Sequence, residues 1–261
     1  MDHPGPGSRV LDVGTPPGVG LGLSGDIVDG MRAVIFDWGG TLTPWRTMDH
    51  LAAWRTYSTS LYPRDPEKAE SMAEALLAAE ESAWARTRVE HRAFTLEQVV
   101  AATGAPVDED ALTAFRTFWE PATYTRPEVA SVLETLRGRG LRVGVLSSTG
   151  WPAAWHEDMF RRDGVLDLFH GCVWSSDLEW TKPHPEAFRA AMAAVDVHDP
   201  TACVYVGDRP YDDIHGSKAL GMRAVLVPHS PIPPHQQVPV AVEPDAVIQR
   251  LADLPGVLDG W

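Results

Sequence analysis

Short apolar runs alternate with helix-length stretches along most of the chain after residue 127. A continuous apolar run bounded by turn residues is typical of a strand buried on both faces. Strands separated by helices of this length predict right-handed βαβ crossovers and a parallel sheet with helices on both faces. The expected elements are helices near 127–137, from about 152, at 185–195 and ending at 221, strands at 141–146, 171–174, 202–206 and 223–227, a proline-rich loop over 228–244 and a last short helix around 245–251.

An earlier apolar run, 34–36, predicts one more buried strand, and the stretch after it changes to a helical period. Apolar residues recur at i, i+3, i+4, i+7 and i+8 from Ala69 to Leu77, which is one face of a helix. Further helices are expected near 48–61, 95–102 and 109–119. Residues 45–123 are therefore predicted to be an all-helical insert. Its expected core contains the large aromatic residues Trp54, Trp84, Phe115 and Trp119.

Residues 1–30 differ from the rest of the chain, because they are rich in Gly and Pro and show no periodicity. They also lack the basic and apolar regions of a signal peptide, so we interpret them as a disordered extension. Met31 precedes the first strand, and translation starting there is a second hypothesis. Residues 20–25 match G-x-G-x-x-G, but no strand precedes them and no helix follows, so a dinucleotide site is not expected.

Composition narrows the possible partners. The chain has 261 residues, a formal net charge of −14 and only three lysines, which argues against a nucleic-acid partner. No apolar run is long enough to span a membrane. The two cysteines lie in apolar surroundings without metal-type spacing, which fits a cytoplasmic protein.

Polar residues that could perform chemistry follow the predicted strands. Asp37, Ser147 and Asp208 each stand at the end of a separate strand, and Lys182 lies in a loop between two others. The carboxyl ends of parallel strands share one edge of the sheet, so these groups are expected to converge. Asp213 follows Asp208 closely. Burying three aspartates together is costly without a counter-ion, and their hard oxygen ligands favour Mg²⁺.

Four short motifs in this order resemble those of the haloacid dehalogenase-like hydrolase superfamily. The resemblance covers about residues 32–227, and it implies a Rossmann-like, doubly wound core made of 31–44 and 124–261, with 45–123 as a small helical cap. The matching stretches are Phe36-Asp37-Trp38-Gly39-Gly40-Thr41-Leu42, Val145-Leu146-Ser147, Lys182-Pro183, and Gly207-Asp208 with Asp213.

The resemblance implies a nucleophile and a metal site. Asp37 would attack phosphorus and form an aspartyl-phosphate that water then hydrolyses. The Asp37 carboxylate, the backbone carbonyl of Gly39 and Asp208 would hold Mg²⁺, and Asp213 would support the ion directly or through water. Small phosphorylated metabolites are the implied substrates.

The resemblance also assigns the phosphate-binding groups. Ser147 and Lys182 would bind phosphoryl oxygens and stabilise the charge of the transition state. Lys218, on the helix after the fourth motif, is expected to be an ordinary solvated lysine. The sequence carries no signal for the oligomeric state.

Gly39 departs from the family pattern. Phosphatases of this family usually carry a second aspartate at that position, which protonates the leaving oxygen and then activates water. Losing such a group typically costs ~10²–10⁴ in rate. The phosphonate-cleaving branch also lacks this aspartate and shares Trp38 followed by a small residue. That branch needs a Schiff-base lysine from the cap, for which Lys68 is the candidate.

Three other hypotheses stay open. Arg46 or Arg55 could hold the carboxylate of a 2-haloacid in a dehalogenase. Asp49 or His50 could replace the missing acid of a phosphatase. A binding module that kept the fold without catalysis is the third, although the retention of Asp37, Lys182, Asp208 and Asp213 favours an enzyme.

Overall fold

A computed structural model describes residues 30–228 and 237–261 of the chain. The expectations for the N-terminal extension, including the glycine motif at 20–25, lie outside these residues, as does the middle of the proline-rich loop. Within the described residues, no helix combines the length and the apolar character needed to cross a membrane.

The core is a six-stranded sheet in the order β3-β2-β1-β4-β5-β6, and every neighbouring pair is parallel. The first strand lies between β2 and β4, so the chain winds outward to one side of it and then to the other. This confirms the predicted α/β class with a doubly wound parallel sheet. The strands are β1 (Ala33–Phe36), β2 (Arg142–Ser147), β3 (Gly171–Trp174), β4 (Cys203–Gly207), β5 (Arg223–Leu226) and β6 (Ala246–Val247).

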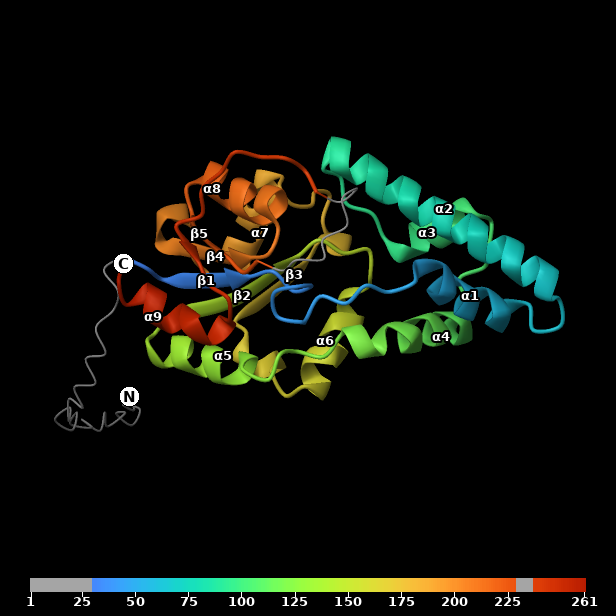
Figure 1. Cartoon of the computed structure of the whole chain (residues 1–261), viewed down its shortest axis with the longest axis horizontal. Coiled ribbons are helices and arrows are strands. Elements are labelled where there is room, and N and C mark those ends of the chain that lie inside the picture. The colour runs from blue at the N-terminus through green and yellow to red at the C-terminus, as the bar shows by residue number, and fades with distance from the viewer. Residues whose placement is uncertain (1–29, 229–236) are drawn as a thin grey trace, which may run out of the picture.

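Helices cover both faces of this sheet (Figure 1). Val34 and Phe36 point into one apolar cluster, while Ala33 and Ile35 point into the other, which explains the continuous apolar run of β1. The first cluster is covered by α5 (Val129–Gly138), α6 (Ala153–Arg162) and α9 (Leu254–Leu258), and the second by α7 (Pro185–Ala194) and α8 (Gly216–Leu220).

The first four helices after β1 form a separate apolar cluster. Trp54 and Phe115 are fully buried in it, Trp119 is half-buried against it, and Trp84 packs its ring on Phe94 at the edge of the cluster. The apolar stripe expected on the second helix points into the same cluster through Ala73 and Leu76. The helices are α1 (His50–Leu61), α2 (Pro66–Glu90), α3 (Leu96–Ala102) and α4 (Glu109–Trp119).

The last expected helix is wrong in its position. Residues 245–251 contain the two-residue strand β6, which pairs with β5, and α9 begins only at Leu254. The carboxylate of Asp245 holds this strand in place, because it accepts hydrogen bonds from the backbone N–H of Ala224 at 2.8 Å and from Lys218 Nζ at 2.7 Å. Lys218 is therefore a half-buried partner of Asp245, not the freely solvated lysine we expected.

Backbone hydrogen bonds connect the helical insert and its flanking segments to the core. Its entry and exit segments lie side by side, since the backbone N–H of Arg126 donates to the carbonyl of Leu42 at 2.8 Å. A second segment, residues 91–96 between α2 and α3, is here called the strap. Its backbone exchanges hydrogen bonds with residues 179 and 181 and donates from Leu96 to the carbonyl of Gly150 at 2.6 Å. The strap thus contacts the loop that carries Lys182 and the loop that follows Ser147.

Candidate active site

The turn after β1 presents Asp37 at the carboxyl edge of the sheet. The carbonyl of Trp38 accepts from the N–H groups of Leu42 and Thr43 at 2.9 and 3.0 Å, which closes the turn. Gly40 has a φ of 93°, a conformation that favours glycine. Gly39 has no positive φ, and a Cβ added there would meet no atom within 4 Å. The backbone conformation therefore favours glycine at position 40, while a Cβ at position 39 would meet no close neighbour.

Lys182 forms the centre of the buried polar groups at this edge. Its ammonium donates to Asp37 Oδ1 at 2.6 Å, to Asp213 Oδ1 at 2.7 Å and to the hydroxyl of Tyr205 at 2.9 Å. An ammonium has three N–H donors, so every one of them has an acceptor. All four residues are buried, with whole-residue exposures of 6% or less.

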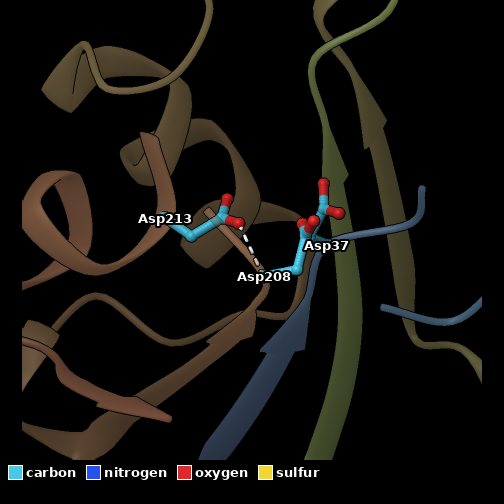
Figure 2. Close-up of side chains that lie close together, drawn as sticks. All are labelled: Asp37, Asp208 and Asp213. Carbon is cyan, nitrogen blue, oxygen red and sulfur yellow. Dashed lines mark hydrogen bonds between the residues drawn. The ribbon is translucent and has the colours of Figure 1, made fainter. Parts of the chain in front are cut away.

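The loop after β4 brings Asp213 back to the sheet edge through a π-helical turn (Pro210–His215). Asp213 Oδ2 accepts from the backbone N–H groups of Asp208 and Arg209 at 3.0 and 2.8 Å, and Figure 2 shows the first of these bonds. A Cβ at position 207 would collide with the Asp213 carboxylate, which explains why glycine precedes Asp208.

Three buried carboxylates could hold a cation together. Asp37, Asp208 and Asp213 each offer an oxygen, and these oxygens lie within 4.8 Å of one another (Figure 2). Lys182 alone cannot balance three carboxylates, although Arg209 contacts Asp208 from the rim at 3.5 Å. A divalent ion would offset the remaining charge, and the oxygen-only donor set suits Mg²⁺. Both oxygens of Asp213 already accept hydrogen bonds, so Asp37 and Asp208 are the better placed direct ligands.

The surroundings shift the pKa of both members of the central ion pair. Burial raises the pKa of Asp37 to about 8; Lys182 opposes this shift, and the carboxylates of Asp213 and Asp208 add to it. Burial by itself would lower the pKa of Lys182, but Asp213 and Asp37 raise it well above its ordinary value. The lysine is therefore cationic, and a second positive charge beside Asp37 would favour the ionised, nucleophilic carboxylate.

Ser147 is the last residue of β2, the strand beside β1, and it is buried at the same edge. The next residue, Ser148, accepts a hydrogen bond from Thr181 Oγ1 at 2.7 Å. This bond joins the loop after β2, which begins directly after Ser147, to the loop that carries Lys182.

Tyr205 is a partner of Lys182 that the sequence motifs did not predict. It lies in the apolar strand β4, where an aromatic ring is ordinarily a packing residue. Its hydroxyl, however, donates to the carbonyl of Leu146 at 2.9 Å and accepts from Lys182. The only available signal was the hydroxyl itself, since a buried tyrosine usually needs a hydrogen-bond partner.

Aromatic rings pack beside the nucleophile turn. His156 is fully buried, stacks on Trp174 with ring centroids 4.1 Å apart, and meets Trp38 edge to face at 4.5 Å. Burial, and to a smaller extent Arg116, lowers the pKa of His156 to about 3, so its ring is neutral at physiological pH. The neutral ring shares a 3.1 Å hydrogen bond with Thr149, which follows Ser147 in the chain.

The candidate residues for other chemistries lie in the insert. Lys68 is in the first turn of α2, with its ammonium 4.1 Å from the ring of Tyr62. The turn joining α1 to α2 is at the end of the insert farthest from the sheet (Figure 1). Arg55 forms an exposed ion pair with Glu70, and Arg46 is exposed in the entry segment. None of these cations has a contact with the buried carboxylates among the described interactions.

The two candidate replacement acids have different environments. Asp49 caps α1, because its carboxylate accepts from the backbone N–H of Ala52 at 3.0 Å. His50 Nδ1 lies 3.2 Å from Glu80 Oε2, and this hydrogen bond raises the pKa of His50. Glu80 also accepts from Trp54 Nε1 at 2.8 Å.

Comparisons with known proteins agree with this architecture. The family model of haloacid dehalogenase-like hydrolases matches residues 31–221. A glyceraldehyde 3-phosphate phosphatase from Pyrococcus abyssi is 39% identical over 100 residues, which are 38% of this chain and 40% of that protein. A phosphoserine phosphatase from Thermus thermophilus is 34% identical over 101 residues, or 39% of each chain. The chain thus spans about two fifths of the length of these curated relatives.

Solved structures match over more of the chain. A HAD phosphatase from Thermococcus onnurineus superposes with a TM-score of 0.63 at 22% identity, covering 88% of this chain and 99% of that one. A 2-haloacid dehalogenase from Pseudomonas syringae superposes with a TM-score of 0.58 at 28% identity over the same shares. The first likeness, at less than 25% identity, concerns the fold alone.

Proposed function

The chain belongs to the haloacid dehalogenase-like hydrolases, and from this membership we propose that it is a Mg²⁺-dependent phosphatase of a small phosphorylated substrate. The observation that carries the proposal is the buried group of Asp37, Lys182, Asp208 and Asp213, which three separate loops bring to one sheet edge. The curated relatives named as phosphatases support the same class of substrate.

Each residue has a role in this proposal. Asp37 attacks phosphorus, so that an aspartyl-phosphate forms as the bond to the leaving oxygen breaks, and water then hydrolyses the acyl phosphate. Lys182 and Ser147 bind the phosphoryl oxygens and stabilise their charge. Asp37, Asp208 and the carbonyl of Gly39 would hold Mg²⁺, with Asp213 orienting the loop. The bound ion supplies Lewis-acid neutralisation of the phosphoryl charge.

We further propose that residues 45–123 act as the cap of the site and that 31–44 with 124–261 form the catalytic core. The strap supports this division, because its hydrogen bonds to residues 150, 179 and 181 join the insert to two of the catalytic loops. A docked insert excludes water from the reacting groups, which strengthens their electrostatic interactions.

The glycine at position 39 leads to a narrower proposal. No carboxylic acid stands two residues after the nucleophile, so a leaving oxygen must depart with less help from a proton. We therefore expect acyl and aryl phosphates, whose leaving groups need little protonation, to react faster than alkyl phosphates. The 2-haloacid reaction also needs no such acid, and the likeness to a dehalogenase makes it the second candidate function.

The test is a screen of the purified protein with and without Mg²⁺ on an aryl phosphate, an acyl phosphate, a phosphonate and a 2-haloacid. We expect Mg²⁺-dependent release of phosphate, reduced by on the order of 10⁴-fold in Asp37→Asn. The matched control is Asp199→Asn, because Asp199 is an exposed aspartate that caps the turn before β4, at the opposite edge of the sheet.

The outcomes separate the hypotheses. Phosphate release that survives Asp37→Asn would contradict the nucleophile. Halide release without phosphatase activity would favour the dehalogenase. An intact, folded protein that is silent on all four substrates would favour a binding module.

A further inference from the structure

The three hydrogen bonds of Lys182 cannot all persist during the proposed reaction. Phosphate binding requires at least one N–H of the ammonium to point at a phosphoryl oxygen, yet Asp37, Asp213 and Tyr205 occupy all three. One acceptor must therefore be released, and the contacts of the three acceptors show which one.

Asp213 and Tyr205 are fixed by further bonds, whereas Asp37 must be free to react. Asp213 is completely buried and accepts two backbone N–H bonds through its other oxygen. Tyr205 is also completely buried, donates its hydroxyl proton to the carbonyl of Leu146 on β2, and packs its ring edge to face with Phe188 at 5.1 Å. The Asp37 oxygen is the one that needs its lone pairs for attack or for a metal.

We propose that Tyr205 is a positioning residue, which together with Asp213 holds the Lys182 ammonium so that its third N–H turns from Asp37 to the phosphoryl oxygen. This inference rests on the proposed function and adds to it a residue outside the four motifs. The two fixed acceptors leave the ammonium only one direction for its remaining donor, and that direction is toward the nucleophile.

A neutral acceptor suits this role. A third carboxylate around Lys182 would add negative charge to a site that already contains Asp37, Asp208 and Asp213, and that approaches an anionic substrate. A phenol accepts the hydrogen bond without adding charge. Burial raises the pKa of Tyr205 well above its ordinary value, so the hydroxyl keeps the proton that it donates to Leu146.

The chain offers a matched control. Tyr57 is a second completely buried tyrosine, and its hydroxyl donates to the carbonyl of Pro106 at 2.6 Å inside the insert. Tyr57→Phe and Tyr205→Phe each remove one buried hydroxyl bonded to a backbone carbonyl. Only Tyr205→Phe also removes a partner of Lys182.

The first readout is the lysine ammonium itself. The sequence contains only Lys68, Lys182 and Lys218, so protein labelled with ¹⁵N-lysine gives one buried ammonium signal and two references in the NMR spectrum. In Tyr205→Phe we expect the Lys182 signal to shift and its exchange with water to speed up by about 10-fold or more, because a fixed acceptor is lost. In Tyr57→Phe it should stay unchanged.

The second readout is the division between kcat and KM. Tyr205→Phe should lower kcat on an aryl phosphate by roughly 10- to 100-fold with KM nearly unchanged. The reason is that a Lys182 N–H with the wrong orientation stabilises the transition state less, while it changes substrate binding little. Tyr57→Phe should change neither constant. In a Lys182→Met background, Tyr205→Phe should have no further effect on any remaining activity.

The two proposals fail in different ways. A Lys182 signal that does not respond to Tyr205→Phe overturns the positioning role, even in an active enzyme. So does a Tyr205→Phe enzyme that responds in KM alone or keeps the kcat of the wild type. A wild-type protein without phosphatase activity overturns the proposed function, and with it the turn of the Lys182 N–H from Asp37 toward a phosphoryl oxygen. The NMR response still decides whether Tyr205 holds Lys182.

Discussion

The sheet edge and the helical insert each place a basic group beside a buried carboxylate, but they enclose the pair to different degrees. At the sheet edge the side chains of Lys182 and Asp37 are 3% and 8% exposed. In the insert the side chains of His50 and Glu80 are 44% and 12% exposed. A nearly dry ion cluster is costly to desolvate, whereas a half-exposed pair is common on protein surfaces. The difference in enclosure is what distinguishes a candidate catalytic centre from an ordinary structural contact.

The two regions also differ in how they are assembled. Glu80 receives both of its hydrogen bonds from α1, the helix that packs directly against its own. Lys182 meets groups from the turn after β1, from β4 and from the loop after β4. The insert pair can form as soon as two neighbouring helices pack. The cluster at the sheet edge forms only when the whole core is folded, so a substitution in it should lower the stability of the whole core.

Removal of the basic residue from each of the two regions tests this difference most directly, through the free energy of unfolding. Lys182→Met leaves Asp37 and Asp213 buried without their cation, and in metal-free protein it should lower the free energy of unfolding by about 3–5 kcal/mol. His50→Gln removes the base of the half-exposed pair and should cost about 1 kcal/mol or less. Urea denaturation of the two variants beside wild type measures both values. Equal losses would mean that the enclosure of the two pairs has no energetic consequence.

The second prediction uses pH to separate a core histidine from the insert histidine. The folded protein keeps His156 neutral down to about pH 3, while the unfolded chain takes up a proton there below its ordinary pKa of 6.5. Stability linked to His156 is therefore complete above pH 6.5 and is lost as the pH falls toward 3. At pH 4 the loss should reach roughly 3 kcal/mol, at ~1.4 kcal/mol per pH unit.

His50 should behave in the opposite sense. Its pKa is raised in the folded protein, chiefly by the hydrogen bond to Glu80, so its contribution is present below the unfolded pKa and is lost as the pH rises through the folded one. The prediction for His156 is checked by measuring the free energy of unfolding of wild type and of His156→Phe from pH 4 to pH 8. Wild type should lose stability relative to His156→Phe as the pH falls. If it does not, the buried histidine is not held neutral.

The sequence anticipated the sheet edge better than the contacts around it. Asp37 and Asp208 were expected to converge with Lys182, because the two aspartates stand at the ends of parallel strands and the lysine lies in a loop between strands. Asp213 was expected there because it follows Asp208 closely. Tyr205 escaped because its ring is an ordinary strand residue, and the lysine that it touches is 23 residues away in the chain. Polar residues in turns after strands form a recognisable sequence pattern, whereas a single tyrosine hydroxyl inside an apolar strand does not.

Backbone pairing was the other part that local patterns could not predict. The strand β6 exists because two residues pair with β5, and the expected helix around 245–251 overlooked this contact. The strap likewise joins the core through backbone hydrogen bonds, which almost any sequence can make. Periodicity reports which side chains are buried, but it does not report which distant backbone lies alongside.

The smallest expected effect concerns position 39, where the sheet edge has unused room. A Cβ there meets no atom within 4 Å and φ is not positive, so Gly39→Asp should be accepted without strain. The new carboxylic acid could protonate the leaving oxygen, and kcat on an alkyl phosphate should rise by about 10- to 100-fold. Rates across phosphate esters of graded leaving-group pKa should fall steeply with that pKa in wild type and less steeply in the variant.

Gly39→Asn is the matched control, since it fills the same space without supplying a titratable acid, and it should leave the steep dependence on leaving-group pKa intact. A wild-type enzyme that shows no such dependence would mean that another group already donates the proton. His50 is then the first residue to examine, because Glu80 raises its pKa and favours the protonated ring that an acid requires. In that case His50→Gln would make the dependence steep, and the insert would share in the chemistry of the sheet edge.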